Sequence, residues 1–224
     1  QPASAAWSDA VTQAHDMTTR GEAAKAFDLR GVPELPGQYR PFAQRLLLAQ
    51  QLVLAGVPFV QVGIGGQDLH TNVRAGVEDV WGKTIDPAVA ALLQNLGRSG
   101  RRVLISFVTE FGRTPKVNGD GGRDHWPSGY TNAVISINQP RFRSGSYGDT
   151  GPDGEFRFDM QARVFTLVDG VRLPDYGQFL WRTLGFDVDA AANAVPTADG
   201  RSSPPVMPRY NKGGAAVFER FFPR

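Results

Sequence analysis

The run Val103–Val108, which is almost entirely apolar, constrains the fold more than any other part of the sequence. A strand with one face in water alternates apolar and polar residues, whereas a continuous apolar run is typical of a parallel sheet covered by helices on both faces. A helix-like segment precedes this run and begins at Asp86-Pro87, an N-cap followed by proline at the first helical position. A further short apolar segment, Phe59–Val62, precedes that helix. Strand, helix and strand in this order predict a βαβ crossover and an α/β fold.

Periodicity and turn residues predict the remaining elements. The expected helices cover residues 8–27, 41–55 and 174–184, and the expected further strands cover 133–137 and 163–168. Residues 138–156 are rich in Gly, Arg and Ser and indicate an insertion or a long hairpin. We expect a helical N-terminal segment over residues 1–26, an α/β core over 27–187 and a Pro/Ala-rich tail over 188–224.

Composition excludes several classes of function. Lys and Arg number 24 against 22 Asp and Glu, and the resulting net charge of +2 without a basic stripe argues against nucleic-acid binding. The chain has no cysteine, so it has neither disulfides nor thiolate metal sites. No apolar run approaches the roughly 18–20 residues of a transmembrane segment. Because the chain opens with Gln1 rather than Met, we expect a processed or truncated product.

Three polar loops that contain histidines and carboxylates adjoin the predicted strands. In an open α/β sheet the ligand site lies beyond the carboxyl ends of the strands. The loops 65–70, 110–115 and 121–127 should therefore meet at one edge of the sheet. They carry two of the three histidines and three carboxylates: Asp68, His70, Glu110, Asp124 and His125. Carboxylate oxygens and imidazole nitrogens are ligands that suit Zn, Mn or Fe, so the convergence predicts a divalent metal site.

Each of these residues also has a purely structural interpretation. Asp68 could cap a turn beside an exposed His70, and Glu110 could form an ion pair with Arg113. His125, beside Trp126, could be a packed and hydrogen-bonded core histidine. The convergence of all three loops favours the metal site over these separate interpretations.

Three segments resemble a known bacterial family, domain of unknown function 1501, which is sulfatase-like and belongs to the alkaline phosphatase superfamily. The segments are FVQVGIGGQDLHTN at 59–72, VTEFGRTPKVNGDGGRDHWP at 108–127 and LPDYGQFLWRTLGFD at 173–187. The resemblance covers roughly Phe27 to Asp187. It implies a three-layer α/β/α sandwich with a mostly parallel sheet, and a metal-dependent hydrolase acting on phosphate or sulfate esters.

The resemblance also assigns roles to individual residues. One or two divalent ions (Zn, Mn, Fe or Ca) would be bound, with Asp68, His70 and His125 at the first ion and Asp124 as a ligand or an orienting group. Glu110 would serve a second ion or position water, and Arg113 would bind the transferred group. Arg123 would be a further anion-binding residue.

Departures from the family pattern leave other functions open. The family's Trp-Asp-Thr-His motif corresponds here to Gln67–His70, so its aromatic residue and its threonine are replaced. No segment before Phe27 resembles the part of the superfamily fold that carries the nucleophile. We therefore expect the C-terminal portion of the fold, completed by a second polypeptide or by homo-oligomerisation, in the periplasm or secreted. The alternatives to a hydrolase are a non-catalytic structural or assembly protein on a decayed hydrolase fold, and a polyanion or carbohydrate binding module.

Overall fold

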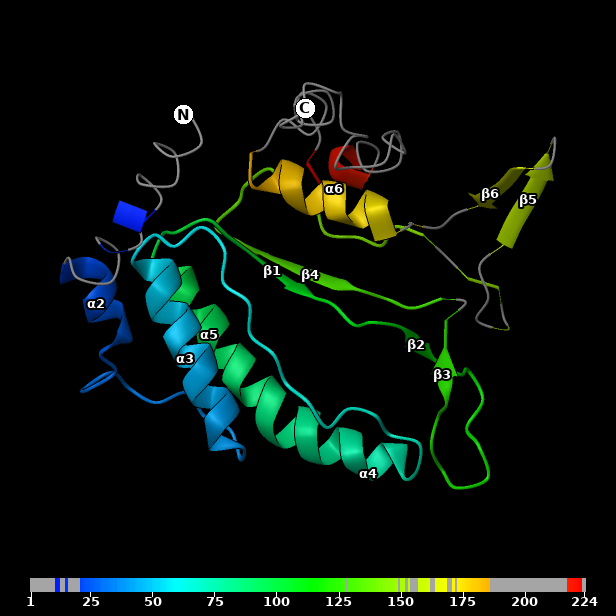
Figure 1. Ribbon diagram of the computed structural model, residues 1–224, viewed down its shortest axis with the longest axis horizontal. Helices are drawn as coiled ribbons and strands as arrows, with labels where there is room; N and C mark the ends of the chain where they lie inside the picture. Colours follow the sequence, from blue (N-terminus) through cyan, green and yellow to red (C-terminus); the bar gives the residue numbers. More distant parts are fainter. Residues whose placement is uncertain are drawn as a thin grey trace. The chain divides into compact units, whose positions relative to one another are not determined.

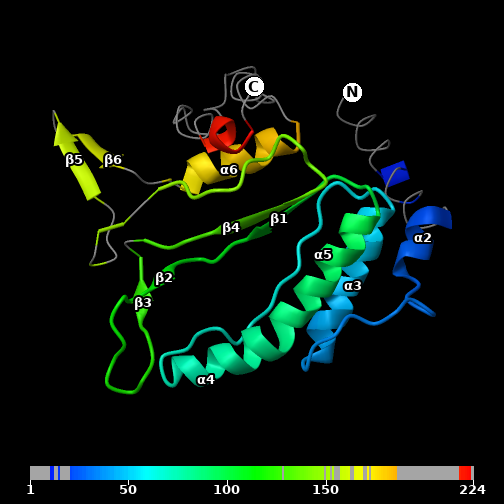
Figure 2. The same cartoon turned by 180° about the vertical axis from the view of Figure 1, so that it is seen from behind.

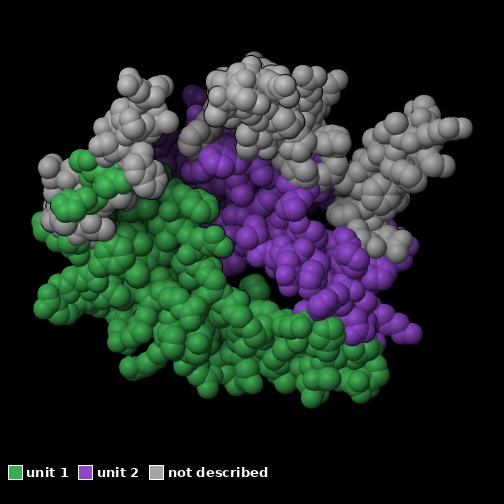
Figure 3. Space-filling model, viewed as in Figure 1, with its two compact units in different colours: residues 1–101, 118–122 green, residues 102–117, 123–224 purple. Residues whose placement is uncertain are grey.

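The computed structural model describes residues 11, 12, 15, 21–127, 129–148, 150–151, 153, 157–161, 164–168, 171, 173–185 and 217–222 (Figure 1). The chain divides into two compact units, which Figure 3 colours separately. Unit 1 comprises residues 1–101 and 118–122, and unit 2 comprises residues 102–117 and 123–224. The predicted boundaries after residues 26 and 187 are untested by this division and stay predictions.

Unit 1 is built from helices. α2 (Gly21–Phe27) packs beside α3 (Arg40–Leu54), and α3 lies alongside α5 (Asp86–Arg98) in both views (Figures 1 and 2). The helix predicted over residues 41–55 is therefore confirmed as α3. The buried faces of α3 and α5 supply most of the apolar core of this unit: Phe42, Ala43, Leu46, Leu47, Ala49, Ala88, Leu92 and Leu96. Between the helices, Asn95 Nδ2 donates a hydrogen bond of 3.0 Å to Gln50 Oε1, which satisfies a buried amide.

The helix that contains α5 begins earlier than its sequence indicates. α4 (Val73–Val77) continues directly into a π-helical stretch, η1 (Glu78–Ile85), and then into α5. Asp86 is therefore an interior residue of a longer helix, and its predicted role as N-cap is wrong. The loop 37–39 crosses η1: Gln38 N donates to Lys83 O at 2.9 Å and Tyr39 N to the buried Thr84 Oγ1 at 3.1 Å. The partners of Lys83 and Thr84 lie about 45 residues earlier in the chain, so a local capping signal at Asp86 does not reflect these contacts.

Unit 2 contains three antiparallel strand pairs within the described residues. β1 (Val103–Phe107) pairs with β4 (Ala133–Ile137), β2 (Gly112–Arg113) with β3 (His125–Trp126), and β5 (Arg157–Gln161) with β6 (Val164–Val168). The strands predicted over 103–108, 133–137 and 163–168 are thus observed as β1, β4 and β6. In the β1–β4 pair, Ile105 lies opposite Ile135.

The predicted three-layer sandwich with a mostly parallel sheet is wrong. No sheet of the described residues has more than two strands, and every pair is antiparallel. The segment Phe59–Val62 is in no strand, and Phe59 is 67% exposed, so the βαβ crossover is absent as well. All five residues of β1 are half-buried rather than buried. The apolar run correctly indicated a strand, but a run of this length does not specify whether its partner is parallel or antiparallel.

α6 (Leu173–Thr183) contributes buried residues to the core of unit 2. Its Tyr176 hydroxyl hydrogen-bonds the Ser106 hydroxyl of β1, and burial raises the pKa of Tyr176. Phe179 is fully buried, and its ring centroid lies 5.8 Å from that of Phe221. Phe221 also stacks on Phe142 at 5.5 Å, so residues 217–222 dock on this unit. The helix predicted over 174–184 is confirmed, and most of the predicted tail over 188–224 lies outside the described residues.

No helix in the described part of the chain combines the length and the apolar character needed to cross a membrane.

Candidate functional site

In unit 1, Asp68 and His70 form a pair on an exposed loop. His70 Nε2 lies 3.1 Å from Asp68 Oδ1, and both side chains are largely accessible to solvent. Two tight turns shape this loop, because Leu69 N donates to Gln67 O and His70 N donates to Asp68 O. The pair thus presents one carboxylate and one imidazole to solvent, side by side.

The side chains of Gln67 and Leu69, in the same loop, contact the helices instead. Gln67 Oε1 accepts a hydrogen bond of 2.9 Å from Trp81 Nε1 of η1. Leu69 packs against α4 so closely that a Cβ on Gly76 would lie 2.6 Å from a Leu69 methyl carbon. Gln67 and Leu69 therefore both anchor the loop to the helices. Anchoring of residues 67 and 69 keeps Asp68 and His70 on the solvent side.

A second segment, residues 118–122, packs against the His70 loop. Asn118 Nδ2 donates to His70 O at 3.0 Å, and Asn118 Oδ1 accepts from the backbone N–H of Asp120 and Gly122. Thr71 bridges Gly121 in antiparallel fashion, and Val73 N donates to Gly121 O at 2.9 Å. A Cβ on Gly122 would lie 1.9 Å from His70 O, so only glycine fits this contact.

Sequence reasoning missed Asn118 and Gly122 as positioning residues. The Asn, Gly and Asp content of residues 118–122 does predict a turn, with the asparagine side chain bonding its own backbone. Nothing local, however, indicates that the turn binds a loop 48 residues earlier in the chain.

In unit 2, the β2–β3 hairpin carries most of the other predicted site residues. Arg113 lies opposite His125, and Gly112 opposite Trp126. The His125 side chain is exposed, and its ring packs on Phe111 with centroids 4.1 Å apart. The alternative of a core histidine is therefore wrong for His125. Asp124 is exposed next to it, and its backbone is fixed by two hydrogen bonds with Thr114.

The two arginines of the hairpin brace its backbone. Arg123 donates through one terminal nitrogen to Thr114 O at 2.7 Å and to Pro115 O at 2.8 Å. Arg113 donates to Arg123 O at 3.1 Å, and its guanidinium carbon lies 5.7 Å from the Phe111 ring centroid. Both arginines are thus engaged inside the hairpin, and Arg113 also lines a hollow. Glu110 is exposed on the segment that leads from β1 to β2.

This hollow has a volume of about 360 Å³ and is formed by the hairpin and residues 129–131. That size is in the range of small-molecule sites. Its lining combines Arg113 with three aromatic rings and threonine hydroxyls: Phe111, Trp126, Tyr130, Thr109 and Thr131.

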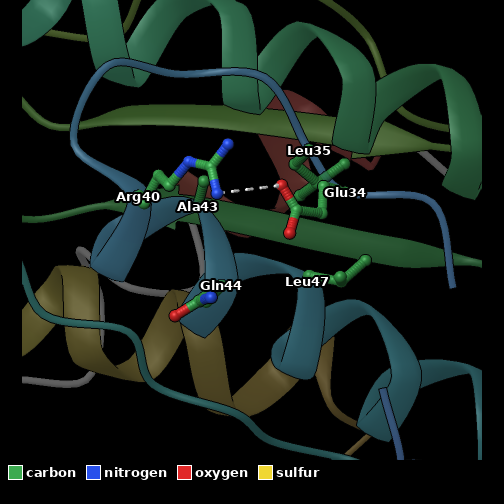
Figure 4. A pocket seen from close by; sticks show the side chains of 6 residues that line it. All are labelled: Glu34, Leu35, Arg40, Ala43, Gln44 and Leu47. Atoms are coloured by element: carbon green, nitrogen blue, oxygen red, sulfur yellow. Dashed lines mark ion pairs between the residues drawn. The ribbon is translucent and has the colours of Figure 1, made fainter. Parts of the chain in front are cut away.

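A second hollow, in unit 1, is far smaller (Figure 4). It has a volume of about 10 Å³, which is close to the space of a single water molecule. Glu34 and Arg40 face each other across it at 4.0 Å, and Ala43 and Leu47 of α3 form its apolar wall. It is too small for a ligand.

The structure therefore groups the predicted residues into two sets. Asp68 and His70 form a pair within unit 1, and the set on the hairpin of unit 2 comprises Arg113, Arg123, Asp124 and His125. Along the chain, residues 118–122 join these sets, since they support His70 and lead directly into Arg123.

Residues 3–135, more than half of the chain, match a family described as "Protein of unknown function (DUF1501)". The match includes every residue of both sets. Comparisons with curated proteins and with solved structures gave no match.

Proposed function

The chain belongs to the DUF1501 family of proteins of unknown function, and on that premise we propose that it is a metal-dependent hydrolase of phosphate or sulfate esters. The proposal includes kinship with the sulfatase-like enzymes of the alkaline phosphatase superfamily. This kinship rests on the motifs around Asp68, Glu110 and His125 and not on the arrangement of strands.

The Asp68–His70 pair is the observation that carries the proposal. At a tetrahedral zinc ion with bonds of about 2.0–2.1 Å, two ligand atoms lie roughly 3.3–3.4 Å apart. The observed 3.1 Å between His70 Nε2 and Asp68 Oδ1 is close to that spacing. The loop would therefore need only a small adjustment to bind one ion through both atoms. The pair is also accessible, as a site for an ion and a substrate must be.

His125 is the third ligand of the proposal. The support for His125 is the resemblance of the surrounding motif. Asp124 would complete the site or orient His125, and Glu110 would serve a second ion or position water.

A bound divalent ion would polarise the ester oxygen and stabilise the negative charge that develops on it. Arg113 would bind the group that is transferred, since a guanidinium matches the oxygens of phosphate and sulfate. Arg123 would act through Arg113, because its carbonyl accepts the Arg113 hydrogen bond and its side chain fixes the hairpin. The proposal assigns the nucleophile to no residue of this chain.

Hydrolysis of 4-nitrophenyl phosphate and 4-nitrophenyl sulfate tests this function on the full chain. We expect turnover that EDTA abolishes and that Zn²⁺ or Mn²⁺ restores. Asp68→Ala and His125→Ala should each lower it at least tenfold, with bound metal lowered in parallel, whereas His15→Ala removes a histidine outside the site and should leave both unchanged. Metal content and turnover that are unaffected by Asp68→Ala and His125→Ala would contradict the proposal. A protein that neither binds metal nor turns over either ester would favour a structural or assembly role.

A further inference from the structure

Asn118 is the one asparagine of the sequence that is followed by glycine. The backbone nitrogen of the residue after an asparagine can attack the carbon of the side-chain amide, which closes a five-membered succinimide ring. A Cβ on that following residue hinders the approach, and glycine has none. The sequence therefore makes Asn118 the asparagine most prone to this reaction.

The structure leaves the attacking nitrogen accessible. Gly119 is exposed, and a Cβ built on it would meet no atom within 4 Å. In the described part of the chain the Gly119 N–H donates no hydrogen bond, whereas the next three backbone N–H groups, of residues 120–122, all donate to Asn118. Water can therefore take the proton of the Gly119 nitrogen as that nitrogen attacks.

The amide under attack is polarised by the same turn. Asn118 Oδ1 accepts hydrogen bonds from Asp120 N at 3.1 Å and from Gly122 N at 2.9 Å. Negative charge develops on this oxygen when the nitrogen adds to the amide carbon. Two backbone donors at roughly 2.7–3.1 Å from such an oxygen form the arrangement of an oxyanion hole, which stabilises the addition step.

We propose that Asn118 is a site of spontaneous deamidation promoted by its own turn. The Gly119 nitrogen bonds to Cγ of Asn118, its proton passes through water to the leaving amide nitrogen, and the Cγ–Nδ2 bond breaks to release ammonia. Water then opens the succinimide at one of its two carbonyl groups, which leaves aspartate or isoaspartate at position 118. The net reaction consumes one water and releases one ammonia.

Either product releases the loop that carries His70. Asn118 Nδ2 donates to His70 O at 3.0 Å, whereas an ionised carboxylate has no proton to donate. Two oxygen acceptors would then face each other, although the hydrogen bonds within the turn could persist. Isoaspartate also adds a methylene group to the backbone of a turn that already touches His70 O through Gly122. In a step that rests on the proposed function, deamidation would thus weaken the metal site at Asp68 and His70 as the protein ages.

Peptide mapping of the full chain tests the modification. The chain is incubated without metal at mildly alkaline pH, and samples from successive times, including time zero, are digested with trypsin and analysed by mass spectrometry. Cleavage after Lys116 and Arg123 gives a peptide in which Asn118 is the only side-chain amide. Residue 118 should convert at least tenfold faster than Asn72, which precedes the β-branched Val73, and should yield both aspartate and isoaspartate. Conversion no faster than that of Asn72 would overturn the inference.

Gly119→Ala tests the attacking nitrogen. The added methyl group meets no atom of the turn but stands beside the nucleophile, so it should slow the conversion of Asn118 roughly tenfold or more. An unchanged rate would overturn the role of the Gly119 nitrogen. The comparison with Asn72 in the unmodified chain decides the question even if this variant fails to fold.

Hydrogen exchange of the backbone amides of Asn72 and Val73 tests the release of the loop, since both donate to residues 120–121. In Asn118→Asp these amides should exchange roughly 10- to 100-fold faster than in the unmodified chain, the range expected when a hydrogen bond is replaced by two facing acceptors. Asn138→Asp makes the same substitution in unit 2 and should leave both rates unchanged. Equal rates in the two variants would overturn the link between residue 118 and the loop.

These measurements need no metal, so they separate this inference from the hydrolase proposal. Zinc should bind roughly 10- to 100-fold more weakly to Asn118→Asp than to Asn138→Asp, and equal affinities would overturn the effect on the metal site. A chain that deamidates at residue 118 but binds no zinc would contradict the hydrolase and leave the modification site standing. A chain that binds zinc but keeps Asn118 intact would leave the hydrolase standing and overturn this inference.

Discussion

Gly122→Ala tests whether residues 118–122 hold the His70 loop in place. The added methyl would lie 1.9 Å from His70 O, 2.0 Å from His70 C and 2.4 Å from Thr71 N, whereas ordinary contacts begin near 3.4 Å. The two segments must therefore separate, and three hydrogen bonds between them would stretch beyond their range: Asn118 Nδ2 to His70 O, Asn72 N to Asp120 O, and Val73 N to Gly121 O. At about 1 kcal/mol each, their loss lowers the free energy of unfolding by roughly 3 kcal/mol. For a chain of this size, this corresponds to a decrease in Tm of roughly 6–12 °C.

Gly119→Ala is the matched control, because it places the same methyl group in the same turn. A Cβ at position 119 has no atom within 4 Å, so its effect should stay within roughly ±1 kcal/mol. Urea unfolding followed by circular dichroism gives both free energies. Equal stabilities for the two variants would refute the account of how this loop is held.

Three further predictions concern stability and titration. Burial raises the pKa of Tyr176 above its ordinary value of 10.0. The contribution of this group to the free energy of unfolding should therefore be complete below pH 10.0 and be lost as the pH rises through the pKa of the folded state. Urea melts from pH 8 to pH 12 should show this decrease in the unmodified chain and not in Tyr176→Phe. Hydrogen bonds from Arg30 lower the pKa of Asp28 to about 2. In Arg30→Gln this pKa should return toward 3.8, which an NMR titration would measure. A pKa that the substitution leaves unchanged would contradict this cause. Phe179→Ala should lower the free energy of unfolding by roughly 3–5 kcal/mol, because the ring is fully buried. Leu173→Ala, at a residue that is 67% exposed on the same helix, should change the free energy of unfolding little. Similar losses in both variants would contradict the assignment of Phe179 to the core of unit 2.

Local signals predicted several of the individual elements, including α3, β4 and α6. The apolar period and Pro41 predicted α3, which spans Arg40–Leu54, and the strand expected over 133–137 coincides with β4. In both cases the pattern that forms the element lies within the element itself. The end of α6 was equally readable, since Gly185 follows the helix with a φ of +87°, a conformation that favours glycine.

Pairing between elements could not be predicted in the same way. β1 and β4 are adjacent and antiparallel, although the apolar run Val103–Val108 indicated a parallel sheet. The partner of a strand depends on contacts between distant residues, which the composition of one strand does not encode. The same holds for Phe59–Val62, whose apolar residues remain without a strand in the described structure.

The candidate site shows the same difference between local features, which the sequence predicts, and contacts between distant segments, which it does not. The spacing of Asp68 and His70 was sufficient to predict that a carboxylate and an imidazole lie together on one loop, since residues two apart in a tight turn lie close together. The dependence of that loop on Gly122, and the ring-lined hollow beside Arg113, arise from contacts between distant segments and were visible only in the structure.

A native mass spectrum of the full chain, equilibrated with Zn²⁺ and recorded under conditions that retain metal, tests the central claim most directly. The account predicts at least one ion per chain, lost in the Asp68→Ala, His70→Ala double variant and retained in His15→Ala. A metal-free chain, or a double variant that binds as much zinc as the unmodified chain, would contradict it.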